Sequence, residues 1–126
     1  MSSDSLEHNK QVVATIDSLF QRTDGDLNFD IVDELVSEDY IQHNPHLTQG
    51  REGLKEFLKQ IYPIPEEFDA SHIISSTMIA EGEYVVRQEI RDHGMLIDTY
   101  RFENGLAVEH WDAFRPNPGH ERMPWF

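Results

Sequence analysis

The sequence predicts an α+β fold, with helices first and a curved antiparallel β-sheet after them. Apolar residues recur at helical spacing as far as Ile61. From Phe68 onward the pattern changes to strand-like alternation, interrupted by short turn sequences. In this layout the N-terminal helices cover one face of the sheet, and the wrap encloses a pocket.

The length and charge of the chain limit its organisation and its partners. We expect 126 residues to form one domain, residues 1–126. The formal net charge of -14 repels phosphate backbones and anionic lipid headgroups, so we expect no nucleic acid and no membrane surface as a partner. No apolar run approaches a membrane span, and residues 1–10 are polar, which predicts a cytoplasmic protein. The absence of cysteine excludes a thiolate nucleophile.

Three helices are expected in the first half of the chain. Residues 4–7 have capping-box spacing, and apolar residues follow at helical intervals through Phe20. A second, short helix should begin near Asn28 and include the apolar residues of 31–36. The apolar stripe within residues 54–61 predicts a third helix, which the prolines that follow would end.

The remaining elements are extended. Residues 40–45 break the helical pattern and form a short extended segment that ends at proline. Four strands follow, at residues 71–80, 84–90, 95–102 and 106–114, with turns at 81–83 and 92–94.

The turn at Glu103-Asn104-Gly105 determines which side chains of the last two strands share a face. A two-residue Asn-Gly loop would place Asp98 opposite Trp111, and the pairs would be mismatched. A three-residue loop with Gly105 in the left-handed position instead pairs Asp98 with His110. We adopt the second register because it agrees with the alternation of the strands.

In this register one face of the hairpin is apolar except at one end. That end carries two carboxylates and an imidazole, which suggests a pocket. The face consists of Asp98, Tyr100, Phe102, Leu106, Val108, His110, Asp112 and Phe114. The opposite face consists of Ile97, Thr99, Arg101, Ala107, Glu109 and Trp111. The two large apolar residues on it, Ile97 and Trp111, favour a homodimer.

Three segments together resemble a known family. They are residues 40–45 (Tyr-Ile-Gln-His-Asn-Pro), residues 50–54 (Gly-Arg-Glu-Gly-Leu), and residues 98–105 running into 108–112. In this order they look like the SnoaL-like polyketide cyclases, a branch of the cone-shaped superfamily that also contains ketosteroid isomerase, limonene epoxide hydrolase and nuclear transport factor two. The resemblance implies a cofactor-free and usually dimeric α+β barrel.

The resemblance also implies catalytic residues. An aspartate near the end of the last strand acts as acid and base in the cyclases, and Asp112 matches it. The partner position, often histidine in the cyclases, is Asp98 here, and His110 could orient Asp112 or donate to an oxyanion. An apolar pocket and a second carboxylate would both raise the pKa of Asp112 toward neutrality, as an enolising base requires. The alternative is a structural ion pair of Asp112 with His110, Arg87 or Arg115.

Four further residues are candidates for binding a substrate. The family match suggests that Tyr40 and His43 line the pocket mouth, although Tyr40 could equally pack in the core and His43 cap the following turn. Tyr100 lies on the catalytic face. Arg87 points inward in two of three plausible registers, where it would approach Asp98 or Tyr100 and form an Asp-Arg-Asp group that resembles the water-holding group of epoxide hydrolases. A surface position for Arg87 is the alternative.

The leading hypothesis is a cofactor-independent enzyme that acts on a small, apolar, enolisable carbonyl compound through Asp112, His110 and Asp98. No metal is expected, because Pro45 separates His43 from His46 and no third ligand is evident. A non-catalytic module that binds a small ligand or a protein is the second hypothesis, and hydrolysis of the epoxide-hydrolase type is a third.

Overall fold

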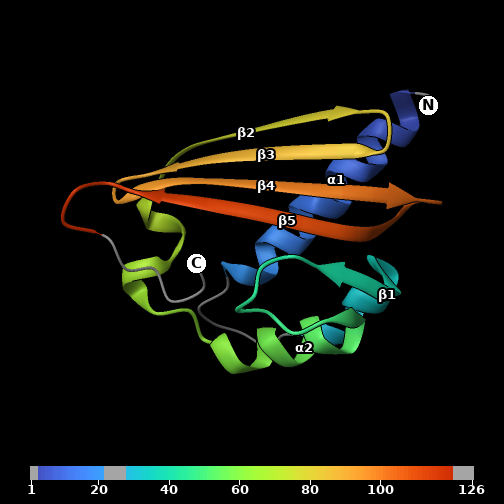
Figure 1. Ribbon diagram of the computed structural model, residues 1–126, viewed down its shortest axis with the longest axis horizontal. Helices are drawn as coiled ribbons and strands as arrows, with labels where there is room; N and C mark the ends of the chain where they lie inside the picture. Colours follow the sequence, from blue (N-terminus) through green and yellow to red (C-terminus); the bar gives the residue numbers. More distant parts are fainter. Residues whose placement is uncertain (1–2, 22–27, 121–126) are drawn as a thin grey trace.

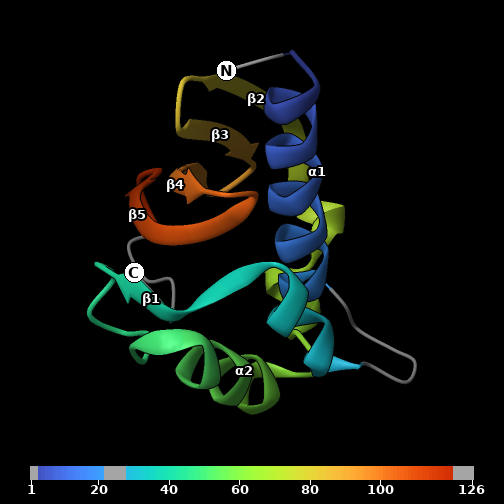
Figure 2. The same ribbon diagram turned by 90° about the vertical axis from the view of Figure 1, so that its right-hand side faces the viewer.

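The computed structural model describes residues 3–21 and 28–120, in which one long helix crosses the inner face of a curved sheet (Figures 1 and 2). Helix α1 is Ser3–Phe20, and α2 is Gly50–Ile61. Three short 3-10 helices are η1 (Phe29–Glu34), η2 (Glu66–Phe68) and η3 (Ala70–His72). The strands are β1 (Val36–Gln42), β2 (Ile73–Glu81), β3 (Tyr84–Arg91), β4 (Gly94–Glu103) and β5 (Leu106–Pro116).

The sheet confirms the predicted α+β class and changes one feature of it. Its strand order is β1-β5-β4-β3-β2. The four C-terminal strands are antiparallel as predicted, whereas β1 runs parallel to β5, so that the sheet is mixed. Strands β1 and β2 remain its two edges, so the cone is open and not a closed barrel. None of the described helices has the length and apolar character that a bilayer crossing requires.

The second predicted helix is shorter than expected because β1 takes over its last residues. The Asn28 side chain accepts a hydrogen bond of 3.0 Å from the backbone N–H of Asp30 and starts η1, as the sequence indicated. Val36, predicted to be helical, is fully buried in β1 instead. The predicted capping box of α1 includes Asp4, whose side chain lies outside the described residues.

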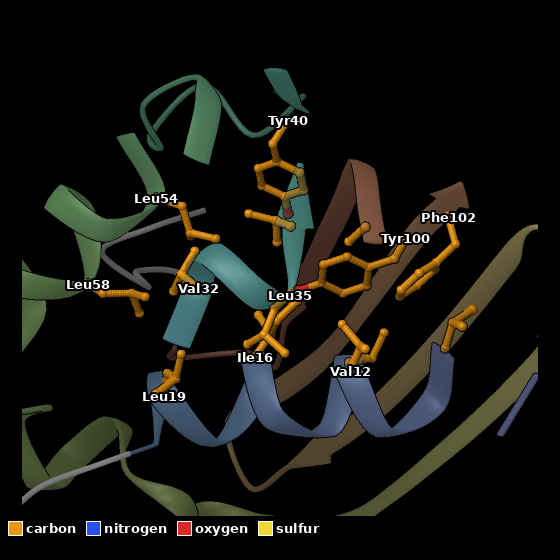
Figure 3. Packing of buried hydrophobic residues seen from close by; sticks show 14 residues of the cluster. Val12, Ile16, Leu19, Val32, Leu35, Tyr40, Leu54, Leu58, Tyr100 and Phe102 are labelled. Carbon is orange, nitrogen blue, oxygen red and sulfur yellow. The ribbon is translucent and has the colours of Figure 1, made fainter. Parts of the chain in front are cut away.

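The hydrophobic core lies between α1, η1, α2 and the sheet (Figure 3). The apolar stripe of α1 meets side chains of η1, α2 and β4 there. The residues labelled in Figure 3 are Val12, Ile16, Leu19, Val32, Leu35, Tyr40, Leu54, Leu58, Tyr100 and Phe102.

The hairpin between β4 and β5 does not have the predicted register. Asn104 and Gly105 have φ values of 52° and 81°, as a two-residue hairpin loop requires, and Glu103 pairs with Leu106. The predicted three-residue loop is therefore wrong. The extra residue is Val108, a β-bulge between the pairs formed by Phe102 and Arg101 with β5.

The bulge explains why the predicted faces are mostly right while the predicted partners are wrong. Beyond it, Asp98 lies opposite Asp112 and not opposite His110, which lies opposite Tyr100. The partners are displaced by two residues, so each side chain keeps its predicted face. Only the residues next to the turn change their face. Ala107 is fully buried on the inner face, where Leu106 and Val108 were predicted.

Candidate active site

A cavity of about 80 Å³ lies between α1, the loop before α2, α2 itself, η2 and the inner faces of β3, β4 and β5. Aromatic and aliphatic side chains form one wall, among them Leu47, Phe57, Phe68, Leu96 and Phe114. Ionisable side chains form the other wall, among them Asp17, Glu89, Arg91, Asp98, His110 and Asp112. An apolar cavity with a few convergent polar groups is typical of a small-molecule site.

Asp98, His110 and Asp112 meet at the polar wall, as the sequence predicted. The bulge brings them to the same face of two adjacent strands. His110 Nε2 lies 2.8 Å from Asp98 Oδ1 and 3.9 Å from Asp112 Oδ2. All three side chains are at most 13% exposed, so their charges interact with little screening by water.

The hydrogen bonds around His110 imply a proton between its ring and Asp98. The Gln42 Oε1 atom accepts hydrogen bonds from the backbone N–H of Asn44 (2.9 Å) and from His110 Nδ1 (2.8 Å). Because Nδ1 donates, Nε2 of a neutral His110 would turn a lone pair toward Asp98. The 2.8 Å contact therefore requires one further proton, held by either His110 or Asp98. A proton held in this position is available to a neighbouring acceptor.

Asp112 is the carboxylate next to this pair. Its side chain is 8% exposed, and Asn44 Nδ2 donates to its Oδ2 at 3.0 Å. Burial is the main cause that raises the pKa of Asp112, and the charge of Asp98 adds to the increase. The hydrogen bond from Asn44 and the nearby His110 oppose it. The pKa remains raised, as an acid–base residue requires.

A second polar group extends the site along β3. Arg87 is 3% exposed, and its Nη1 lies 3.5 Å from Asp98 Oδ2, which confirms the predicted inward position. Its Nη2 contacts Asp17 Oδ2 at 3.0 Å and also Glu89. Glu89 in turn accepts a hydrogen bond of 2.8 Å from Arg91 Nε. Burial raises the pKa of Asp17 to about 7, although the charge of Arg87 opposes this.

The predicted substrate-binding residues Tyr100 and Tyr40 lie in different parts of the structure. Tyr100 lines the cavity as expected, and its ring centroid lies 4.5 Å from that of His110. Tyr40 is 2% exposed within the hydrophobic core, which was the alternative for this residue. Burial and the charges of Asp98 and Asp112 raise its pKa well above the ordinary range.

The placement of His43 at the pocket mouth is wrong. Its backbone N–H donates to the carbonyl of His110 at 3.1 Å, which continues the pairing of β1 with β5 and turns the side chain to the outer face. There the imidazole stacks on Trp111 with a centroid distance of 4.9 Å. Its Nε2 lies 2.6 Å from Glu109 Oε2. Gln42, the preceding residue, points inward instead and contacts His110.

Five polar residues described above were not predicted from the sequence: Asp17, Gln42, Asn44, Glu89 and Arg91. Asn44 and Gln42 lie in the extended segment before Pro45, where the backbone positions them beside His110 and Asp112. Asp17 had a detectable signal, because it occurs at helical spacing between the buried Val13 and the partly buried Phe20. A carboxylate on the apolar stripe of a helix requires a buried partner, and Arg87 is that partner.

Asp98, His110 and Asp112 also offer one nitrogen and two oxygen donors within 4.8 Å of one another, a set that could hold a metal ion. The guanidinium of Arg87 already supplies positive charge beside Asp98. The donor set is therefore compensated without an ion, and the proton held by the His110–Asp98 pair would compete with a metal for Nε2.

Comparison with known proteins connects this geometry to a family. The model of the SnoaL-like domain matches residues 12–110 of the chain, a range that includes His110 and Asp98. A comparison with curated proteins finds no match.

Solved structures show the same fold. A putative SnoaL-like polyketide cyclase from Jannaschia sp. CCS1 is 15% identical, with 90% of each chain covered and a TM-score of 0.63. A putative polyketide cyclase from Bacillus cereus ATCC 10987 is 14% identical, with 90% of this chain and 78% of that chain covered and a TM-score of 0.60. TsrD from Streptomyces laurentii is 19% identical, with 90% of each chain covered and a TM-score of 0.56. At these identities the likeness concerns the fold alone.

Proposed function

Because the chain belongs to the SnoaL-like domain family, we propose that it is a cofactor-independent enzyme that acts by acid–base chemistry on a small enolisable carbonyl compound. The observation that carries this proposal is the position of Asp112, a buried carboxylate of raised pKa beside a pair that shares a proton. A base and a proton donor on one wall of an apolar cavity are the two groups that enolisation needs.

In the proposed step, Asp112 removes the proton from the carbon next to the substrate carbonyl. The electron pair of that C–H bond forms the C=C bond of the enol, and the carbonyl oxygen takes the proton held between His110 and Asp98. Returning a proton from Asp112 to another carbon gives an isomer, whereas attack of the enol on a second carbonyl gives an aldol product. Asn44 fixes Asp112 through Oδ2, which leaves Oδ1 for the substrate.

The cavity supports a small and uncharged substrate. Its volume of about 80 Å³ is well below the roughly 300–1,000 Å³ of sites for drug-sized ligands. Asp17, Glu89, Asp98 and Asp112 place four carboxyl groups on the polar wall against the two guanidiniums of Arg87 and Arg91, which disfavours an anionic ligand. The aromatic wall favours an apolar body on the carbonyl compound.

Hydrogen–deuterium exchange tests this step without knowledge of the natural product. Small ketones and esters are incubated with the protein in D2O, and loss of the proton signal next to the carbonyl is followed by NMR. We expect exchange with the wild type and a loss of at least about 100-fold with Asp112→Asn, the size of a general base contribution. Asp39→Asn, at an exposed carboxyl group of β1 outside the cavity, is the matched control.

A carboxylate titration by NMR distinguishes a catalytic Asp112 from a structural one. Comparison of the wild type with Asp112→Asn assigns the signal, and a pKa above that of an ordinary aspartate is expected. If the pKa is lowered and Asp112→Asn leaves the exchange unchanged, the enzymatic proposal is wrong. A non-catalytic module that binds the same class of ligand would then be the better interpretation.

Hydrolysis is a second candidate function, favoured by one observation. Arg87 Nη1 is buried and makes no hydrogen bond within the described residues, although it lies 3.5 Å from Asp98 Oδ2. Asp112 could take a proton from a water molecule held between these groups, and the oxygen of that water would attack an epoxide carbon. The ring C–O bond at that carbon breaks, and the ring oxygen takes the proton of the His110–Asp98 pair. Turnover of a small epoxide to a diol, lost in Arg87→Lys, would favour this function over enolisation.

We also propose a homodimer that forms through the outer face of the sheet. Ile79, Tyr84 and Val86 are 63%, 46% and 37% exposed on this face, and pairing across β4 connects Val86 with Trp111. An apolar surface shared by several strands favours association. Sedimentation velocity should give a dimer for the wild type and a monomer for Val86→Glu, and a monomeric wild type would contradict the proposal.

A further inference from the structure

We propose that His72, Asp92 and His93 form a binding site for a divalent metal ion, with zinc as the ion it fits best. The site lies outside the cavity described above and does not depend on the proposed function. It is built where three separate segments meet: η3, the turn between β3 and β4, and the chain that follows β5. Figure 1 shows these segments at the same end of the sheet.

The donor atoms are close enough for one ion to contact all of them. His72 Nδ1 lies 2.8 Å from Asp92 Oδ2, and His93 Nδ1 lies 3.4 Å from Asp92 Oδ1. The three ligand atoms of the group lie within 4.8 Å of one another. In a tetrahedral zinc site with bonds of roughly 2.0–2.2 Å, neighbouring ligand atoms are separated by about 3.3 Å. Small side-chain rotations therefore suffice to bring all three onto one ion.

In both histidines the ring also forms a hydrogen bond to a backbone group, as is usual for histidines that bind a metal. The backbone carbonyl of Glu67 can only accept, so His93 Nε2 donates to it across 3.1 Å. The ring of His72 forms a hydrogen bond to the backbone of Glu66 in addition to its contact with Asp92. A metal-binding histidine almost always donates its second ring N–H to such a group, which orients the lone pair of the first ring nitrogen toward the metal.

This arrangement leaves an uncompensated lone pair on His93. With its proton on Nε2, a neutral His93 turns the lone pair of Nδ1 toward the carboxylate of Asp92. The Nδ1 atom is buried and has no hydrogen-bond partner within residues 3–21 and 28–120. Either a proton or a cation must lie between the two groups, because a lone pair and a carboxylate repel each other. A zinc ion would bind the lone pair of His93 Nδ1 and the carboxylate of Asp92 together.

A third imidazole lies beside the three donors, and the site is open to solvent. The ring of His120 lies edge-on to that of His93 with a centroid distance of 5.9 Å, and both residues line the same surface depression. The side chain of Asp92 is 55% exposed, so that an ion can reach the site from solvent. Two or three imidazoles with one carboxylate suit zinc, whereas calcium and magnesium prefer oxygen ligands alone.

The site would stabilise the wall of the cavity. Phe68 lines both the cavity and the depression, and its ring lies 6.3 Å from that of His93. An ion held by His72 and His93 would connect the segment that carries Phe68 to the β3–β4 turn. We therefore expect zinc to raise the melting temperature of the protein.

Isothermal titration of tag-free, chelator-treated protein with zinc chloride tests the proposal. We expect one zinc ion per chain, and at least a 10-fold loss of affinity in His72→Gln and in Asp92→Asn, since even groups behind a ligand contribute 10- to 100-fold. His110→Gln is the matched control, because it removes the imidazole of the other donor cluster and should leave zinc binding unchanged. Nitrogen NMR of the imidazoles should show a zinc-dependent shift of His93 Nδ1.

Three results would overturn the proposal: no zinc binding, binding that is equal in all variants, or binding that is lost only in His110→Gln. The second variant, Asp92→Asn, preserves the size of the side chain in the turn and keeps the test valid if His72→Gln destabilises the fold. Deuterium exchange of a ketone by zinc-free protein tests the cavity separately, so the two proposals can fail independently.

Discussion

Replacing Asp17 by asparagine should remove a large pH-dependent contribution to the stability of the protein. The Asp17 carboxyl group lies in the cavity against Arg87, and burial raises its pKa from the ordinary value of 3.8 to about 7. Between these two pH values the folded protein holds a proton on Asp17 that the unfolded chain has lost. Raising the pH through this window therefore favours unfolding.

The magnitude follows from the displaced pKa. One additional proton on the folded state lowers the free energy of unfolding by ~1.4 kcal/mol for each pH unit. From an ordinary value of 3.8 to about 7 this amounts to about 4 kcal/mol. The Asp17 side chain is 25% exposed, so that screening by solvent is limited. The asparagine of Asp17→Asn cannot ionise, so the variant does not lose this stability as the pH rises.

Urea unfolding of both proteins at several pH values between 4 and 8 measures the effect. The stability of Asp17→Asn relative to the wild type should increase across this range by about 4 kcal/mol and level off above pH 8. Because only the difference is used, the titration of other carboxyl groups cancels. Asp39→Asn, at an exposed position, is the control. A difference that stays constant within about 1 kcal/mol would refute a raised pKa for Asp17.

Two further predictions concern the hydrogen bonding and the packing around the site. In Asn44→Ala, loss of the hydrogen bond to Asp112 should raise the pKa of this carboxyl group further, which carboxylate NMR would detect; a decrease would contradict the geometry. Gly94→Ala would place a Cβ atom 2.4 Å from the Phe114 ring and should lower the stability by roughly 1–3 kcal/mol in urea unfolding. Gly82→Ala meets no atom within 4 Å and should cost less, about 1 kcal/mol from its positive φ; equal losses would show that the clash is relieved.

The sequence was sufficient for those parts of the fold that depend on local patterns. Apolar periodicity predicted α1 and α2, and alternation predicted the four antiparallel strands. The parallel strand β1 was predicted only as an extended segment, because its pairing partner β5 lies more than sixty residues away. A local sequence pattern does not predict which strand an extended segment will pair with.

The site was predictable where alternation places residues, and not where backbone irregularities do. Asp98, His110 and Asp112 were assigned to one face because alternation is preserved on both sides of the bulge. Their partners were wrong because the sequence does not distinguish an extra residue in the loop from one at Val108. His43 was misplaced because its orientation depends on the pairing of β1 with β5.

Three residues of the apolar wall lie outside the sheet that carries Asp98, His110 and Asp112, and this has a consequence for how such a protein can change during evolution. Asp98, His110 and Asp112, the proposed acid–base residues, lie on paired strands, where a backbone shift would disturb the pairing along both strands. By contrast, Leu47, Phe57 and Phe68 come from a loop, from α2 and from η2. Substitutions at these three positions can reshape the space for a ligand while the acid–base residues stay in place. If the proposed function holds, new substrates could therefore be acquired by mutation of these three positions alone, with the reaction type kept by the residues on the strands.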